Sequence, residues 1–385
     1  MANNIWESGS TKVAQVHTLE VDSQTDGDVW VVLLEDYLGN SDSVTFTSTA
    51  AATTAEIMNS LGAQIVAATA TGNAPWSGIT ATEDDTTLTL TGTAGQPFTV
   101  TPTVTGTGTW DVDTDTTECS GPNLYNDPQN WSLQAIPVNT NDVIIPYYAS
   151  NDIYGYDASG IEHASFTVED GCPIAIGSPL KYLSIEVSTT GTFTLGGLGL
   201  SYINSTCSDN DGVMSVRNAG TGGGDYGSSL NLDGDGIHTV TIDAPGNAKI
   251  GLGVLGSSSM SIVAQVIIRN GIVELGTITS SPNLTIYAGR VTLKSALTTV
   301  TVHGGILYHN KGSITTMSVR TNGTVDASRD QTAKTITNTS VFRGSTLNDP
   351  LGVYTFTNGI DYQYCDLGDA EVKHGPHRTW TPSAI

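Results

Sequence analysis

The chain has 385 residues and a formal net charge of −24, with 43 glycines and only 14% charged residues. This length is enough for two domains with separate cores, and a composition rich in Gly, Thr and Ser favours short strands and turns over helix. No run of 18 apolar residues occurs and residues 1–10 lack a basic and apolar signal pattern, so neither a membrane span nor a secretory signal is expected. The four cysteines form no CxxC motif, which argues against a metal cluster.

Nearly all of the negative charge lies in the first half of the chain. Residues 1–180 hold one base and 23 acids, a net charge of −22, whereas residues 181–385 have a net charge of −2. Such a field repels nucleic-acid phosphates and anionic lipid, so neither nucleic acid nor a membrane is expected as a partner. The field favours either a basic partner or simple solubility, in which the acidic surface is solvated and has no dedicated partner.

Residues 1–108 are expected to form an N-terminal β-rich domain with one helix. Strands are predicted for the apolar or alternating segments 11–21, 28–36, 43–49, 86–92 and 97–104. Between them, residues 53–70 change to a helical period. One face of this helix carries Ile57, Met58, Leu61, Ile65 and Val66. Thr53, three residues before Glu56, is placed to form a capping box at the helix start, and an α+β domain is the prediction.

Residues 109–150 are interpreted as a linker followed by the cap of a second architecture. Residues 109–123 are polar and show no apolar period. The segment "NWSLQAIPVNTNDVIIP" then brings Trp131, Pro137 and Asp142 close together in the sequence, immediately before a four-residue apolar run. Trp131 is expected to plug the open end of a stack of strands, which would otherwise expose unpaired backbone and an apolar core.

Residues 151–350 contain a repeat that predicts a right-handed parallel β-helix. Four segments align on Gly271, Gly289, Gly305 and Gly323, spaced 18, 16 and 18 residues apart, with a short alternating strand on each side. We expect each glycine to turn a corner at a positive φ. A β-sandwich is the rival interpretation, but the regular glycine spacing favours the β-helix. Residues 351–385 are assigned to a C-terminal cap or tail.

This order of parts resembles structural proteins of tailed bacteriophages and prophages. The resemblance rests on "TFTSTAAATTAEIMNSLGAQIVAA", on "TLTLTGTAGQPFTVTPTV" and on "SGPNLYNDPQNW" followed by "IPVNTNDVIIP", and it covers most of residues 10–330. The "NW…NDVII" element is also similar to the caps of β-helices in bacterial surface proteins. The resemblance implies a virion component and supplies no catalytic residues.

Motifs that could carry chemistry are few, and no catalytic, cofactor or metal site is predicted. Residues 209–212 and 232–238 have the Asp-Gly character of calcium loops but lack the bidentate Glu of an EF-hand, so ordinary turns are expected. Carboxylate pairs for glycan cleavage would be Asp233 with Asp235 or Asp326 with Asp330, yet their sequence context is that of loops. A non-enzymatic protein is therefore expected, with no cofactor.

Two functions remain. The first is a capsid decoration protein on the virion surface, with the major capsid protein as its partner. Such a protein would be a homo-oligomer, and a homotrimer would match the local three-fold symmetry of a capsid. The alternative is a tail fibre or tailspike that binds host surface glycan, with depolymerase activity as a further option. Exposed aromatic residues are what glycan binding requires, and residues 147–156 hold four of the 14 tyrosines.

Overall fold

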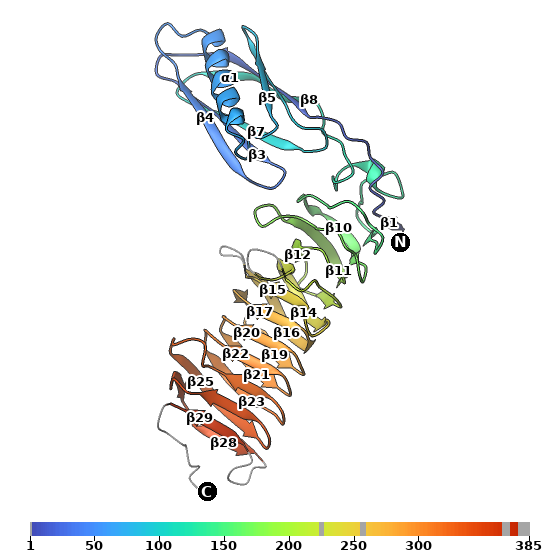
Figure 1. The fold of residues 1–385 in the computed structure, drawn as a ribbon, viewed down its shortest axis with the longest axis vertical. Helices are drawn as coiled ribbons and strands as arrows, with labels where there is room; N and C mark the ends of the chain where they lie inside the picture. The colour runs from blue at the N-terminus through green and yellow to red at the C-terminus, as the bar shows by residue number, and fades with distance from the viewer. Residues whose placement is uncertain (1, 223–226, 255–258, 364–369, 376–385) are drawn as a thin grey trace.

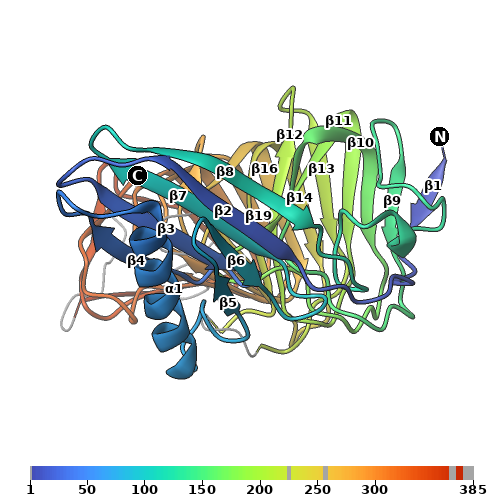
Figure 2. The ribbon, with the colours of Figure 1, turned by 90° about the horizontal axis from the view of Figure 1, so that it is seen from above.

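The computed structural model describes residues 2–222, 227–254, 259–363 and 370–375. Within them the protein is mainly β, with one α-helix (Figure 1). An N-terminal domain lies at one end of an elongated stack of parallel strands, and the strands run across the long axis (Figures 1 and 2). No helix in the described part of the chain is long and apolar enough to cross a membrane.

The N-terminal domain consists of two antiparallel sheets and helix α1. Its elements are β2 (Val16–Ser23), β3 (Val29–Asp36), β4 (Ser41–Thr47), α1 (Thr54–Ala70), β5 (Thr80–Glu83), β6 (Thr87–Thr91), β7 (Phe98–Thr105) and β8 (Thr109–Thr117). One sheet has the order β5-β6-β2-β8 and the other β4-β3-β7. Apolar residues of α1 and of both sheets form a single core, which includes Leu19, Trp30, Leu61 and Leu88. This is the predicted α+β domain.

Helix α1 begins as expected and differs from the prediction on one face. The capping box is confirmed, because the Thr53 side chain accepts a hydrogen bond from the Glu56 backbone and the Glu56 side chain accepts one from the Thr53 backbone. Ile57 and Leu61 are buried against the sheets, whereas Val66 is 50% exposed. Val66 follows Ile65 by about 100° around the helix, which turns it away from the core.

Strand β8 corrects the predicted linker. Residues 109–117 extend the first sheet, and β8 pairs antiparallel with β2 along its length. The ring of Trp110 packs edge-on against buried Trp30, with the centroids 5.1 Å apart. The outward residues of β8 are Asp and Thr, so the strand has little apolar alternation and its pairing with β2 could not be recognised from local pattern.

The second part, here called the parallel stack, runs from residue 142 to residue 374. Its first strands are β9 (Asp142–Ile145), β10 (Asp157–Val168), β11 (Leu183–Leu195), β12 (Ser201–Cys207), β13 (Gly212–Val216), β14 (Leu230–Asp243), β15 (Lys249–Leu252), β16 (Met260–Asn270) and β17 (Ile272–Leu275). They continue with β18 (Ile278–Thr279), β19 (Asn283–Ile286), β20 (Arg290–Leu293), β21 (Leu297–Val302), β22 (Ile306–His309), β23 (Ile314–Val319) and β24 (Thr324–Asp326). The last are β25 (Lys334–Phe342), β26 (Thr346–Asp349), β27 (Tyr354–Phe356), β28 (Ile360–Gln363) and β29 (Glu371–His374).

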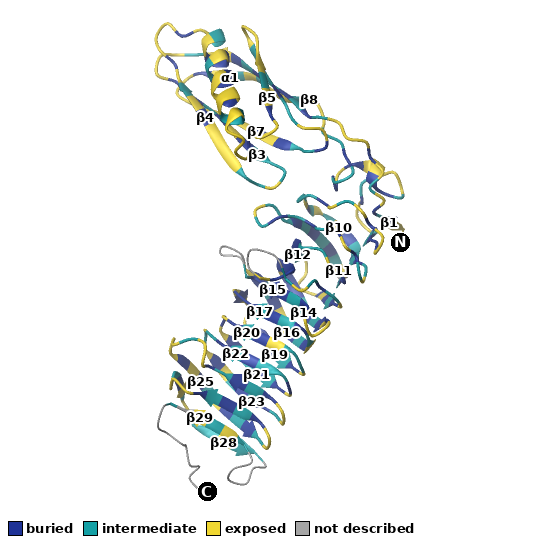
Figure 3. Ribbon diagram, viewed as in Figure 1, coloured by how far each residue is buried: buried dark blue, intermediate teal, exposed yellow. Residues whose placement is uncertain are grey.

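Every pairing within the stack is parallel, and each strand pairs with the equivalent strand one coil later. From β16 onwards one column is β16-β19-β21-β23-β25-β28, and a neighbouring column is β17-β20-β22-β24-β26-β29. Inward side chains consequently lie one above another along the axis. One such row contains Val143, Phe166, Phe193, Met214, Val240, Val266, Leu284, Val300 and Met317, all buried. These residues belong to one continuous apolar core, and Figure 3 shows buried, dark blue positions recurring along the strands of the stack.

The stack is longer than the predicted range 151–350 at both ends. At its start β9 already pairs with β10, because the apolar run 143–145 supplies inward residues for the first coil. At its end β27, β28 and β29 continue the pairing through residue 374, so the described part of the predicted C-terminal cap belongs to the stack. The remaining residues of that cap, 364–369 and 376–385, lie outside the described residues.

Candidate functional site

The start of the parallel stack is closed by a cluster of aromatic side chains. Trp131 is fully buried, and its indole Nε1 donates a hydrogen bond to the Tyr125 carbonyl oxygen at 2.7 Å. The Trp6 ring meets the Trp131 ring edge-on with centroids 5.1 Å apart, and the Tyr125 ring does so at 5.0 Å. All three side chains belong to the core of the stack. Trp131 therefore lies at the start of the stack, which is the position predicted for it from the sequence.

The outermost strand of the stack comes from the beginning of the chain. Strand β1 (Asn3–Ile5) pairs in parallel with β9, with Asn3 opposite Asp142 and Ile5 opposite Ile144. Residues 2–7 therefore belong to the stack and not to the N-terminal domain, which corrects the predicted range 1–108 (Figure 1). The signal that could have revealed β1 is the pair of large apolar residues Ile5-Trp6, which stands between polar residues.

Buried polar residues fix the path of the segment that joins the two parts. The Asn130 side chain donates to the carbonyl oxygens of Gly121 and Leu124 and accepts from the Ser10 backbone N–H at 2.9 Å. The Asp127 carboxylate caps the short 3-10 helix Pro128–Asn130 and accepts a hydrogen bond from the Ser10 hydroxyl. A buried amide that is fully hydrogen-bonded specifies one conformation of its surroundings.

The other two predicted cap residues support the first coil. The Pro137 side chain is buried. Asp142 begins β9, and its carboxylate accepts a 2.6 Å hydrogen bond from the Ser165 hydroxyl of β10. Asp142 therefore ties the first two strands of the stack together through their outward side chains.

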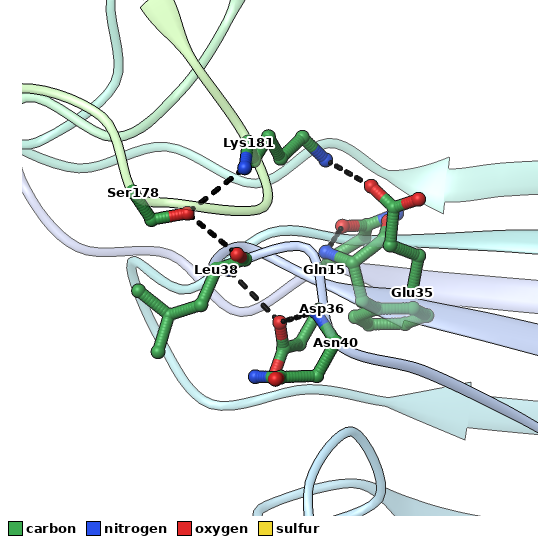
Figure 4. A network of polar contacts seen from close by, with 8 residues as sticks. Gln15, Glu35, Asp36, Leu38, Asn40, Ser178 and Lys181 are labelled. Carbon is green, nitrogen blue, oxygen red and sulfur yellow. Dashed lines mark hydrogen bonds and ion pairs between the residues drawn. The ribbon is translucent and has the colours of Figure 1, made fainter. Parts of the chain in front are cut away.

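The turn between β3 and β4 contacts the stack directly (Figure 4). The Ser178 hydroxyl donates to the Leu38 carbonyl oxygen at 2.6 Å, and Lys181 Nζ lies 2.8 Å from Glu35 Oε1. Gly39 has φ 89°, and a Cβ on it would lie 2.8 Å from Leu180 Cβ. The turn therefore approaches the loop between β10 and β11 so closely that this position requires glycine.

Two tyrosines extend the same contact. The Tyr37 and Tyr154 rings lie 4.4 Å apart, and burial raises the pKa of Tyr154 to about 12. A pocket of about 290 Å³ lies beside this turn, lined in part by Asp36, Asn40 and Phe98. The Asp36 carboxylate accepts hydrogen bonds from Leu38 N, Asn40 N and the Asn40 side chain, so its oxygens serve the turn rather than the pocket. The pocket thus adds no evident chemistry to the contact.

The four repeat glycines lie at one corner of the stack, but they are not equivalent. Gly271, Gly289 and Gly305 have φ values of 115°, 83° and 70°. At the fourth corner the left-handed residue is Asn322, with φ 67°, and Gly323 follows it. The expectation of a positive φ at Gly323 is therefore wrong. Asn tolerates this region better than most residues, which allows the corner to form one position earlier.

The turn expected for residues 232–238 is wrong, because Asp233 and Asp235 lie within strand β14 and pair in parallel with β12. Asp326 is the last residue of strand β24. Asp326 accepts from the Ser328 backbone and Asp235 from the Gly236 backbone. Hydrogen bonds from Thr332 lower the pKa of Asp330, which is the opposite of what a general acid requires. Among the residues that the structure describes, no three His, Cys, Asp or Glu side chains gather into a group that could hold a metal ion.

A pair of carboxylates that the sequence did not suggest lies on the first coils. Glu162 of β10 and Glu186 of β11 are direct partners in the parallel register. Burial and the charge of Glu162 raise the pKa of Glu186. Like charges directly opposite each other on neighbouring strands are destabilising. The two residues lie 24 positions apart, so only the register of the folded stack reveals the pair.

The tyrosine-rich stretch 147–156 divides into two halves. Tyr147 and Tyr148 are 63% and 60% exposed, and their rings meet edge-on. Tyr154 and Tyr156 instead pack on Tyr37 and Tyr125. Half of the stretch therefore serves the packing of the first coils and half is open to solvent.

Comparison of the chain with protein-family models, with curated proteins and with solved structures finds no match.

Proposed function

We propose that the parallel stack is a right-handed parallel β-helix and that the protein is a non-enzymatic structural component of a tailed-bacteriophage particle. In this proposal it is a capsid decoration protein that docks through its N-terminal domain on the major capsid protein, as a homo-oligomer. The β-helix part of the proposal is supported by the coil-by-coil parallel register and by the inward rows of apolar residues. We propose a right-handed β-helix because connections between parallel strands are right-handed almost without exception.

The observation that carries the docking proposal is the unequal charge of the two parts. Residues 11–117 of the N-terminal domain hold one base, Lys12, and 14 acids. Residues 181–385 are close to neutral. An acidic domain joined to a stiff stack that is close to neutral beyond its first strands fits a protein that docks by charge at one end and projects the stack outward. The similarity to virion proteins in the sequence supports the same role.

The experiment is release of the protein from purified particles across a salt series. The Debye length falls from about 10 Å at 0.1 M salt to about 3 Å at 1 M, so contacts between exposed charges weaken while apolar contacts persist. We expect progressive release with rising salt, and rebinding of the full-length protein to stripped particles when the salt is removed.

A matched pair of variants identifies the docking part. Asp26→Asn with Asp85→Asn removes two exposed charges from turns of the N-terminal domain, and Asp209→Asn with Asp211→Asn removes two exposed charges from a turn of the stack. Only the first pair is expected to weaken rebinding. Weaker rebinding of the second pair alone would reverse the proposed orientation. A copy number far below that of the major capsid protein would favour the fibre or tailspike alternative.

A further inference from the structure

One corner of the parallel stack carries a row of cationic and aromatic side chains, which we call the corner strip. Ile268 pairs with Ile286, Ile286 with Val302, Val302 with Val319 and Val319 with Val341 on successive coils. The residue that follows each of these lies on the outer surface at the same corner. The corner strip consists of Arg269, Tyr287, His303, Arg320 and Phe342.

Neighbouring members of the strip contact one another. The Tyr287 and His303 rings are stacked, with centroids 4.9 Å apart and planes 6° from parallel. The Arg320 guanidinium lies 4.0 Å from the centre of the Phe342 ring. Coils repeat about every 4.8 Å, so the strip presents flat rings and guanidinium groups at the spacing of the coils. Tyr287 is 52% exposed, which leaves much of its side chain available to a ligand.

The part of the stack that carries the strip has a net charge opposite in sign to that of the rest of the chain. Residues 249–348 hold nine bases and three acids, a net charge of +6 in a chain of −24. Two of those acids are engaged in ion pairs, Glu274 with Lys294 and Asp330 with Lys334. Within the described residues, Arg320 Nε is buried without a hydrogen-bond partner. The strip is thus a cationic surface with a buried donor at one of its members.

We propose that the corner strip binds an acidic polysaccharide, whose sugar rings lie on Tyr287 and whose carboxylates pair with Arg269 and Arg320. Aromatic faces with a few convergent polar groups are the ordinary lining of ligand sites, and guanidinium groups pair with carboxylates in a planar, two-pronged geometry. A polymer that carries both rings and charges also fits a strip in which the arginines flank the stacked rings of Tyr287 and His303.

Nucleic acid is the less favoured occupant. Double-stranded DNA carries one charge per ~1.7 Å of its axis. The acidic N-terminal half, with its net charge of −22, repels such a dense polyanion more strongly than a polymer with fewer charges. This inference does not depend on a virion role, since a polysaccharide could be bound by a decoration protein, a fibre or a cell-surface protein.

The test is calorimetric titration of the full-length protein with four probes. Polygalacturonate supplies rings and carboxylates, dextran supplies rings alone, poly-L-glutamate supplies carboxylates alone, and oligothymidylate represents nucleic acid. We expect polygalacturonate to bind most tightly. Tyr287→Ala and Arg269→Gln are each expected to weaken that binding at least about fivefold, because a stacked ring or a paired cation is lost. Arg320→Gln is a third variant, whose melting temperature is checked because Arg320 packs on Phe342.

The matched control is Tyr147→Ala, which removes a tyrosine of similar exposure on a different part of the stack. It is expected to leave the affinity unchanged. Absence of polygalacturonate binding, or equal loss in the Tyr147 variant, would overturn the proposal. Equal binding of poly-L-glutamate that persists in Tyr287→Ala would point to an acidic protein surface instead, including the N-terminal domain of a second copy. Tighter binding of oligothymidylate would assign the strip to nucleic acid.

Discussion

The corner glycines differ in which atoms a Cβ added at each position would meet. A Cβ on Gly289 would lie 2.4 Å from the Gly271 carbonyl oxygen, and one on Gly305 would lie 2.5 Å from the Gly289 carbonyl oxygen. A Cβ on Gly271 would meet nothing closer than the Ile250 side chain at 3.6 Å. The three positions therefore share a left-handed backbone, but only two of them also exclude a methyl group by contact with the preceding coil.

This difference predicts a ranking among alanine substitutions. Gly271→Ala should lower the free energy of unfolding by about 1–3 kcal/mol through backbone strain alone. Gly289→Ala and Gly305→Ala should cost more, because the coils must also separate. Denaturant unfolding of the three variants measures the ranking. If all three variants were as stable as the parent protein, the left-handed backbone conformation at these corners would be contradicted.

At the scale of elements, the end of the stack depends on Trp6 and Trp131 together. Trp6→Ala and Trp131→Ala should each destabilise the first coils by roughly 3–5 kcal/mol, as loss of a buried aromatic does. Their effects should not add, since an edge-on aromatic pair contributes about 0.5–1.5 kcal/mol beyond its buried area. Amide hydrogen exchange is the measurement, with faster exchange expected in β9 and β10.

Trp110→Ala is the matched control for these variants. Trp110 also packs edge-on against a buried Trp, but within the N-terminal domain. It should accelerate exchange in β2 and β3 and leave β9 unchanged. If Trp6→Ala left β9 and β10 fully protected, β1 would contribute nothing to closing the stack.

Elements with a local signal were the ones that sequence could predict. Helix α1 has its own capping residues and apolar face, and the corner glycines mark the coils. Strand β1 has three residues and a partner 139 positions away, so its one local signal, the Ile5-Trp6 pair, does not identify the strand that it joins. The corner strip does have a local signal in the sequence, because Arg269, Tyr287 and His303 each stand two residues before a repeat glycine. The carboxylate pair Glu162–Glu186, in contrast, exists only in the register of the folded coils.

For the whole molecule, two buried histidines in different coils, His163 of β10 and His309 of β22, contribute to its response to acid. Burial lowers the pKa of His163 and of His309 to about 4, and His309 is held by the Tyr354 hydroxyl and the Gly312 carbonyl oxygen. Both pKa values lie below the value of about 6.5 in the unfolded chain. The unfolded chain therefore takes up these protons first, so stability is complete above pH 6.5 and falls as the pH drops toward 4.

The expected loss is about 3 kcal/mol for each histidine across that window. Melting temperatures measured from pH 7 to pH 4 test this, and His309→Gln should flatten the profile. His303→Gln is the matched control, because His303 is exposed on the corner strip and should leave the profile as it was. An unchanged profile in His309→Gln would assign the acid response to other groups.

The position of β1 also determines the order in which the protein can be completed during synthesis. Strand β1 leaves the ribosome before the N-terminal domain, yet its partner β9 is made 139 residues later, after that entire domain. Chains grow at about 5–20 residues per second, and domains generally fold as units in that order. The α+β domain can thus fold while β1, which precedes it, still lacks its partner strand. When β9 emerges, β1 can fold back across the finished domain and pair with it, so a strand made before the domain joins the stack only after the domain is complete.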